Sequence, residues 1–162
     1  MSSRKDDDAQ RVLNAFRHLV KALRVADRAG LKQHGVGAAQ IFVLHELSRH
    51  SPLSVNELAE RTATDQSTVS VVANKLVAKG LVTSSRSDED ARRAELALTA
   101  KGRQLVRKLP PPVQHALIAG VRRFPPARVR DLADMLERIV GELGVSDERP
   151  PMFFEDRDRR RR

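Results

Sequence analysis

The chain has 162 residues, which is enough for one domain or two small lobes around a buried core. It contains no cysteine, which excludes disulfides, thiol catalysis and thiolate metal sites, and its formal net charge of +9 favours polyanionic partners such as nucleic acids. No run of about 18 apolar residues is present and the charged beginning MSSRKDDDAQ has no apolar core, so we expect a cytoplasmic protein with neither a membrane span nor a signal peptide.

Two helices are predicted in the first third of the chain. After a solvated lead-in of residues 1–8, apolar side chains recur at helical spacing up to the glycine-containing segment RAGLKQHGVGAAQ, so the first helix is expected to end near Ala29. A second helix carries Ile41 and Leu44 on one side. Pro52 ends it, because the residue before a proline disfavours the helical conformation.

The segment LSVNELAERTATDQSTVSVVANKLVAKGLV predicts two helices joined by a short turn. Ser54 and Glu57 fit a capping box at the start of the first helix. Thr64 or Asp65 can cap the second helix, which is expected to run to Lys79. This spacing is typical of a helix-turn-helix, whose second helix, about 66–79, lies in the DNA major groove; the alternative is a helical hairpin within a larger core.

A hairpin is predicted next, because LVTSS and RAELALT suit strands and the polar segment RSDEDAR lies between them. Arg86, Arg92 and Arg93 flank the acidic residues of this segment, and a two-stranded tongue with arginines at its tip can enter a minor groove. Asp90 precedes Arg92 by two residues and is placed to hold its guanidinium in a fixed direction. The alternative is a solvated turn.

Further helical segments follow the hairpin. Thr99 can cap a helix that the Pro110–Pro112 run should interrupt, with the first of these prolines at the start of a new helix. Pro125 and Pro126 begin a last helix that ends near Gly144.

The predicted terminal helices carry more apolar face than one small core can cover, which favours a homodimer over an intramolecular bundle. The expected fold is mainly α with a small β-hairpin: a winged helix-turn-helix lobe with N- and C-terminal helices forming a dimerisation domain. The expected division is residues 1–37 for the N-terminal dimerisation helix and lead-in, 38–99 for the winged lobe, 100–144 for the C-terminal dimerisation helices and 145–162 for a mobile basic tail.

Several short motifs occur in a fixed order between Leu53 and Leu105. They are Glu57-Leu58-Ala59, Ser67 to Ser70, Lys75 to Val82, Asp90-x-Arg92 and Leu98-Thr99 with Gly102. In this run the chain resembles the MarR family of bacterial transcriptional regulators. The resemblance implies a homodimer on a near-palindromic operator in double-stranded DNA, usually a repressor, and many members are released by small, often anionic aromatic ligands.

By position, the resemblance makes Arg92 the arginine at the wing tip and Asp90 its positioning acid. Gln66 and Asn74 can read adenine edges, and Lys75 can reach guanine or phosphate. The full set predicted to contact DNA is Ser54, Gln66, Ser67, Thr68, Ser70, Val71, Asn74, Lys75, Arg86, Asp90, Arg92 and Arg93.

The chain departs from the family pattern in three places. Val71 stands where many relatives have a basic residue, the Pro110–Pro112 run is unusual in a helix that links wing to dimer, and the absence of Trp and Tyr puts an aromatic ligand pocket in doubt.

Other classes of site find little support. His45 and His50 in HELSRH are five residues apart, whereas the zinc-protease helix needs four, and no phosphate loop or nucleophile elbow is present. We therefore expect no enzyme, metal or cofactor. Two alternative functions stay open: a sequence-blind architectural DNA-binding protein, and a winged-helix module that binds protein.

Overall fold

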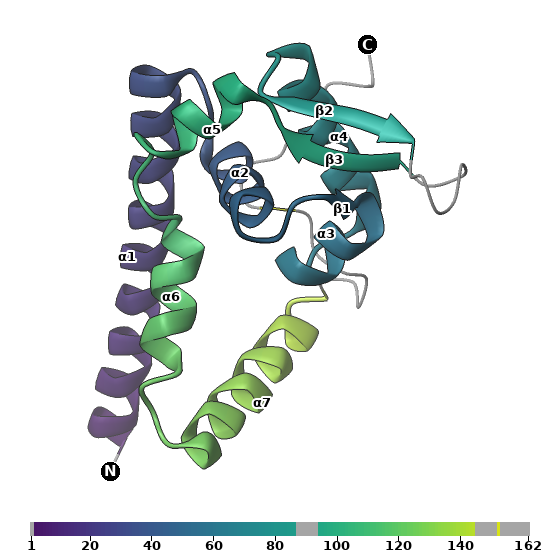
Figure 1. The fold of residues 1–162 in the computed structure, drawn as a ribbon. Helices are drawn as coiled ribbons and strands as arrows, with labels where there is room; N and C mark the ends of the chain where they lie inside the picture. Colours follow the sequence, from purple (N-terminus) through teal and green to yellow (C-terminus); the bar gives the residue numbers. More distant parts are fainter. Residues whose placement is uncertain (1, 87–93, 145–151, 153–162) are drawn as a thin grey trace.

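The computed structural model describes residues 2–86, 94–144 and 152, and shows a mainly helical fold with one small sheet at the edge of the molecule (Figure 1). We call residues 38–98 the winged lobe, and α1 (Ser2–His34), α6 (Val113–Val121) and α7 (Pro126–Glu142) the helical arms. The fold is mainly α with a small antiparallel sheet, as predicted. The elements are α1 (Ser2–His34), α2 (Ala38–His50), β1 (Leu53–Ser54), α3 (Val55–Thr62), α4 (Gln66–Ala78), β2 (Val82–Arg86), β3 (Ala94–Leu98), α5 (Ala100–Val106), α6 (Val113–Val121) and α7 (Pro126–Glu142).

The hydrophobic core lies in the winged lobe and is centred on α2. Val43, Leu44 and Leu47 of α2 have no exposed surface. Burying one such side chain stabilises the fold by about 1.5–3 kcal/mol, so these contacts fix α3, α4 and the sheet around α2. The fully buried side chains that pack with them in one cluster are Leu58, Val69, Val72 and Leu76.

The sheet has three strands in the order β1-β3-β2. The predicted hairpin is β2 and β3, which pair antiparallel with Val82 opposite Leu98. β1 adds a third strand that the sequence did not predict, with Leu53 opposite Leu96. A strand of two residues is too short to show the alternation by which strands are recognised in a sequence.

The first helix is longer at both ends than its sequence predicts. Residues 2–8 are helical and not a separate lead-in, and α1 passes through Gly30 instead of ending near Ala29. A Cβ at Gly30 would lie 2.6 Å from the Val36 carbonyl oxygen and 2.7 Å from Ile41 Cδ1. The glycine is therefore required by the close approach of the α1–α2 turn, and it does not end the helix.

The proline run separates α5 from α6. α6 begins after Pro112, which is its N-cap, and not at Pro110 as the sequence predicts. The reason is that each proline disfavours the helical conformation of the residue before it, which keeps Pro110 and Pro111 out of a helix. Pro126 stands at the first turn of α7, as predicted, with its φ already suited to a helix.

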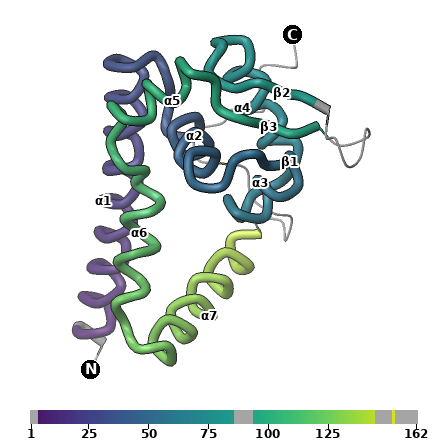
Figure 2. The backbone as a smooth tube through the Cα atoms, viewed as in Figure 1, coloured from purple at the N-terminus to yellow at the C-terminus, as the bar shows by residue number. Residues whose placement is uncertain are grey.

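The helical arms expose much of their apolar surface. α1 and α6 lie side by side in opposite directions, and α7 turns back from the end of α6 toward the winged lobe (Figure 2). α7 has no buried residue. No helix within the described ranges is long and apolar enough to cross a bilayer. The exposed apolar side chains of the arms are Val12, Leu13, Phe16, Leu19, Val20, Val25, Leu31, Leu117, Ile118, Leu132, Met135, Ile139 and Val140.

Met152 lies in the segment that the sequence predicts to be a mobile tail, but its side chain is buried. Its side chain is 3% exposed and belongs to the core cluster of the winged lobe. A methionine is apolar and flexible enough to fill a gap at the edge of such a core. The remaining residues of the predicted tail beyond Gly144 lie outside the described ranges.

Candidate nucleic-acid interface

The turn between α3 and α4 is fixed by backbone and side-chain bonds. Ser54 accepts from the Glu57 N–H through its Oγ (3.2 Å) and donates its own N–H to Glu57 Oε2 (2.8 Å), which confirms the predicted capping box. At the other end of α3, Ala63 is left-handed with a φ of 52°. The N–H of Thr64 donates to the Ala59 carbonyl (3.0 Å), so the turn holds α4 at one angle to α3.

Asp65 caps α4. Its Oδ1 accepts from the N–H of Thr68 (2.8 Å) and from the hydroxyl of Ser67, and its Oδ2 accepts from the hydroxyl of Thr68 (2.6 Å). The sequence left Thr64 and Asp65 as alternative caps. The structure decides for Asp65, because Thr64 is buried and its hydroxyl lies 2.8 Å from that of Thr62.

α4 ends in the turn that the sequence predicts. Gly80 is left-handed with a φ of 65°. The N–H of Gly80 donates to the Val77 carbonyl (2.8 Å), and the N–H of Leu81 donates to the Leu76 carbonyl (3.0 Å). These are the two bonds of a Schellman motif, and they lead the chain directly into β2.

One face of α4 is buried and the other is turned outward. Val69, Val72 and Leu76 have no exposed surface. The predicted contact residues that the structure brings together on the outward face, exposed or half-buried, are Gln66, Ser67, Ser70, Val71, Asn74 and Lys75.

The other residues predicted to contact DNA do not lie on the outward face of α4. Thr68 is 2% exposed and serves the cap, so its side chain does not reach the outward face as the sequence suggested; its hydroxyl donates inward to Asp65. The Ser54 hydroxyl serves the cap of α3. Arg86 is the last residue of β2, opposite Ala94. The remaining three, Asp90, Arg92 and Arg93, lie outside the described residues.

A lysine that the sequence did not single out ties α4 to the α1–α2 turn. The Nζ of Lys79 donates to the Gly35 carbonyl and to Gln40 Oε1 (3.0 Å). Partial burial, and then the nearby charge of Lys75, lower the pKa of Lys79. The contact spans distant parts of the chain, so no local pattern could have revealed it.

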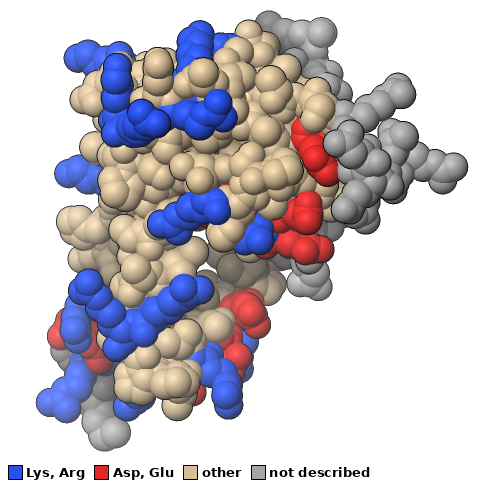
Figure 3. All heavy atoms as spheres, viewed as in Figure 1, with Lys and Arg blue, Asp and Glu red and all other residues tan. Residues whose placement is uncertain are grey.

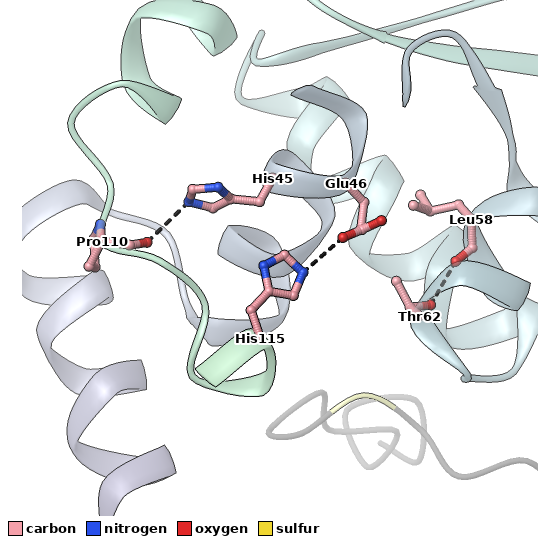
Figure 4. A network of polar contacts seen from close by, with 6 residues as sticks. All are labelled: His45, Glu46, Leu58, Thr62, Pro110 and His115. Carbon is pink, nitrogen blue, oxygen red and sulfur yellow. Dashed lines mark hydrogen bonds and ion pairs between the residues drawn. The ribbon is translucent and has the colours of Figure 1, made fainter. Parts of the chain in front are cut away.

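A histidine network joins α2 to α6 (Figure 4). His115 Nε2 lies 2.9 Å from Glu46 Oε1, and the His115 ring meets Phe42 edge to face with centroids 5.2 Å apart. His45 Nε2 lies 3.1 Å from the Pro110 carbonyl oxygen. Burial is the main reason why the pKa of His45 is lowered, although the bond to Pro110 acts in the opposite direction.

A cavity of about 590 Å³ adjoins this network. Phe42 and His115 contribute rings to its wall, and Arg49, Arg61 and Arg122 contribute cationic groups from α2, from α3 and from the end of α6. On the face drawn in Figure 3, Lys and Arg side chains lie on both sides of the hollow between the winged lobe and the lower helices, and Asp and Glu side chains lie beside it on the right. Such a cavity can accept an anion that has an apolar ring.

The part of the chain that the structure describes has no cluster of three His, Asp or Glu side chains that could hold a metal ion.

Comparison with known sequences points to one family. Residues 34–93 match the sequence model of the MarR family. The HTH-type transcriptional repressor MdtR of Bacillus subtilis is 38% identical over 72 residues, which are 44% of this chain and 46% of MdtR. The chain thus spans about half the length of this curated relative.

Solved structures resemble the fold over most of the chain. One is BpsR of Bordetella bronchiseptica, from a study of the regulation of its DNA binding by 6-hydroxynicotinic acid; it has a TM-score of 0.56 and 26% identity, and the match covers 84% of this chain and 94% of BpsR. Another is the MepR–DNA complex of Staphylococcus aureus, with a TM-score of 0.57, 21% identity and coverage of 83% and 97%. The likeness to MepR supports the fold, which is that of a winged helix with helical arms.

Proposed function

We propose, from the match of residues 34–93 to the sequence model of the MarR family, that the chain is a sequence-specific DNA-binding transcriptional regulator that acts as a homodimer. The observation that carries the proposal is the rigid α3–turn–α4 unit, which holds an uncovered polar helix face beside the β2–β3 hairpin. In this reading α4 enters a major groove and the wing, with Arg92, enters the adjacent minor groove.

The charge and the relatives support the same function. The net charge of +9 favours a polyanion, and the phosphates of duplex DNA attract Lys and Arg irrespective of sequence. MdtR is a transcriptional repressor, and repression is accordingly the mode of action that we propose for this chain.

The helical arms supply the second half of the proposal. Their exposed apolar side chains form faces on α1, α6 and α7 that the chain itself leaves uncovered within the described ranges. A second copy with the same faces would bury them about a two-fold axis, and two winged lobes would then meet two half-sites of a near-palindromic operator.

We further propose that a small anionic aromatic compound releases the protein from DNA by binding the cavity beside the histidine network. The rings of Phe42 and His115 and the guanidinium groups of Arg49 and Arg122 support this ligand class. Regulation of BpsR by 6-hydroxynicotinic acid supports it as well. Titrating the protein–DNA complex with 6-hydroxynicotinic acid and benzoate should lower DNA occupancy, and Arg49→Gln with Arg122→Gln should weaken that response without weakening DNA binding.

The DNA-binding function is tested by selection of bound duplexes from a random pool, followed by competition with unrelated duplex at moderate salt. An operator reader should keep a specificity ratio of about 10³ or more. Equal binding of all duplexes would support an architectural protein instead. Failure to retain any duplex at low salt would support a protein-interaction module.

The wing is tested separately. Arg92→Ala should weaken operator binding by about 1–3 kcal/mol while the circular-dichroism spectrum is unchanged. The control is Arg11→Ala, which removes the same charge from an exposed position on α1, where the arginine pairs with the nearby Asp8. Equal binding by the folded Arg92 variant and the control would remove the wing from the interface.

A further inference from the structure

The outward face of α4 has an unusual composition for a helix that reads DNA. All residues of α4 are described, and the one charged side chain among them is Lys75. An arginine or lysine that donates two hydrogen bonds to guanine is the commonest specific contact in a major groove. The centre of this face must therefore read bases by other means.

The position of Lys75 follows from helical geometry. At 100° per residue, Ser67, Val71 and Asn74 lie within about 60° of one another around the axis and opposite the buried side chains. Lys75 lies about 80° from Ser67 and about 40° from Val71, so it stands at one edge of the face. Its charge can reach a phosphate or a base at that edge of the contacted segment.

Ser67 offers an acceptor and not a donor. Its hydroxyl hydrogen is donated to Asp65, which also receives two bonds from Thr68 and is thereby held in place. The lone pairs of the Ser67 oxygen then suit a base amino group, which adenine and cytosine present in the major groove and guanine and thymine do not. The adjacent carboxylate disfavours the acceptor edge of guanine further.

Val71 and Asn74 occupy the middle of the face. Val71 is half-buried and apolar, and its methyl groups suit the C5-methyl group of thymine. Asn74 is exposed, and a side-chain amide can bond adenine at both N6 and N7. The two side chains are three residues apart and can meet neighbouring base pairs.

We propose that Val71 and Asn74 select A·T pairs at the centre of each operator half-site, that Ser67 accepts from an adenine or cytosine amino group beside them, and that guanine is read at the flank of this face, near Lys75. This inference rests on the proposed DNA-binding function and specifies the base composition that the site accepts. Affinity then comes mainly from contacts to phosphate and from the wing, and the helix contributes discrimination.

The first test is the sequence of duplexes that the full chain selects from a random pool. Selected half-sites should share a run of A·T pairs at their centre, and a G·C pair placed there should weaken binding about tenfold per replaced pair. A selected consensus with G·C pairs at the centre would overturn the proposal.

The second test uses Val71→Arg, which places a guanine-reading side chain at the centre of the face. This variant should acquire a preference for guanine at one central position of the half-site. The matched control is Val77→Arg on the same helix, because Val77 is exposed and lies about 120° from Val71 around the axis. The control should bind all duplexes more tightly at low salt and acquire no new base preference.

The outcomes separate the inference from the function on which it rests. A chain that retains no duplex, or binds all duplexes equally, contradicts the proposed function. A chain that selects an operator, but whose central base preference is the same in the Val71→Arg variant, contradicts the assignment of Val71 to the base-reading face. Both variants are compared with the parent chain by urea unfolding, so that a change in preference is scored only for folded protein.

Discussion

Gly102 lies at the closest approach between α5 and the start of β2. A Cβ at this position would stand 2.0 Å from the carbonyl oxygen of Leu81. That oxygen is fixed because it accepts from the N–H of Thr99 (3.1 Å) and from its hydroxyl (3.2 Å). Gly102→Ala should therefore lower the free energy of unfolding by about 2 kcal/mol or more, measured by urea titration.

The control for this substitution is Gly141→Ala in α7. No atom lies within 4 Å of a Cβ built there. Alanine is also about 0.5–1 kcal/mol better than glycine inside a helix, so this variant should be unchanged or more stable. Equal urea midpoints for the two variants would show that the contact at Gly102 is not as tight as the structure indicates.

Ala63 presents the opposite case, an alanine where the backbone favours glycine. Its φ of 52° places it in the left-handed region, which costs a residue with a Cβ about 1–2 kcal/mol. Ala63→Gly removes that cost but gives the unfolded chain more freedom, so we expect a net gain of about 0.5–1 kcal/mol. The measurement is the melting temperature, and a lower value in the glycine variant would contradict the prediction.

At the scale of elements, the joint between α2 and α6 should make stability depend on pH. Burial lowers the pKa of His45 below its ordinary value of about 6.5, and the neighbouring His115 and Arg49 act in the same direction. The unfolded chain then binds a proton more readily than the native chain. Stability is therefore fully present above about pH 6.5 and falls as the pH drops below it.

This dependence is measured by urea midpoints between pH 5 and pH 8. His45→Gln keeps a donor for the Pro110 carbonyl but removes the titrating group, so its midpoint should vary less with pH than that of the parent chain. His50→Gln is the control, because His50 is exposed at the end of the same helix. A parent curve as flat as that of His45→Gln would show that His45 does not contribute.

The elements that the sequence predicts correctly are those with a local cause. The capping box of Ser54, the hairpin, and the glycine turn at Gly80 all depend on residues a few positions apart. β1 was missed, because its pairing with β3 joins segments some forty residues apart. The end of α1 was placed wrongly for a related reason: Gly30 was read as a helix stop, whereas it is required by packing against Val36.

The residues of the candidate interface were likewise predictable only where their placement has a local cause. Helical periodicity predicts which side of α4 is turned outward, and the structure has Gln66, Asn74 and Lys75 exposed there. Periodicity cannot predict that Thr68 turns inward to Asp65, because both are polar and either could serve the cap or the surface. The tie from Lys79 to the α1–α2 turn depends on tertiary packing, which no spacing in the sequence encodes.

At the scale of the whole molecule, the winged lobe holds nearly all of the core and the arms hold the uncovered apolar surface. We expect the chain to sediment as a dimer, and the double substitution Leu132→Glu with Ile139→Glu to yield monomers with much weaker operator binding. The substitutions should act on self-association, because both side chains belong to the exposed apolar face of α7.

Arg138→Glu is the control for the double variant. It introduces the same side chain at an exposed polar position of α7, beside Ile139 but on another side of the helix. This variant should sediment as a dimer, as the parent chain does. A parent chain that is monomeric at micromolar concentration, or a double variant that stays dimeric, would contradict the assignment of the arms to self-association.

The prolines between α5 and α6 have a consequence for how such a molecule can change over evolutionary time. A single continuous rod would transmit any alteration of its far end to the lobe that we propose contacts DNA. Here Pro110–Pro112 interrupt the rod, and α6 is tied to the winged lobe through its packing against α1 and through contacts such as that of His115 with Glu46. Substitutions on the outer face of α7 can therefore alter the proposed self-association while the proposed DNA-reading helix α4 keeps its geometry.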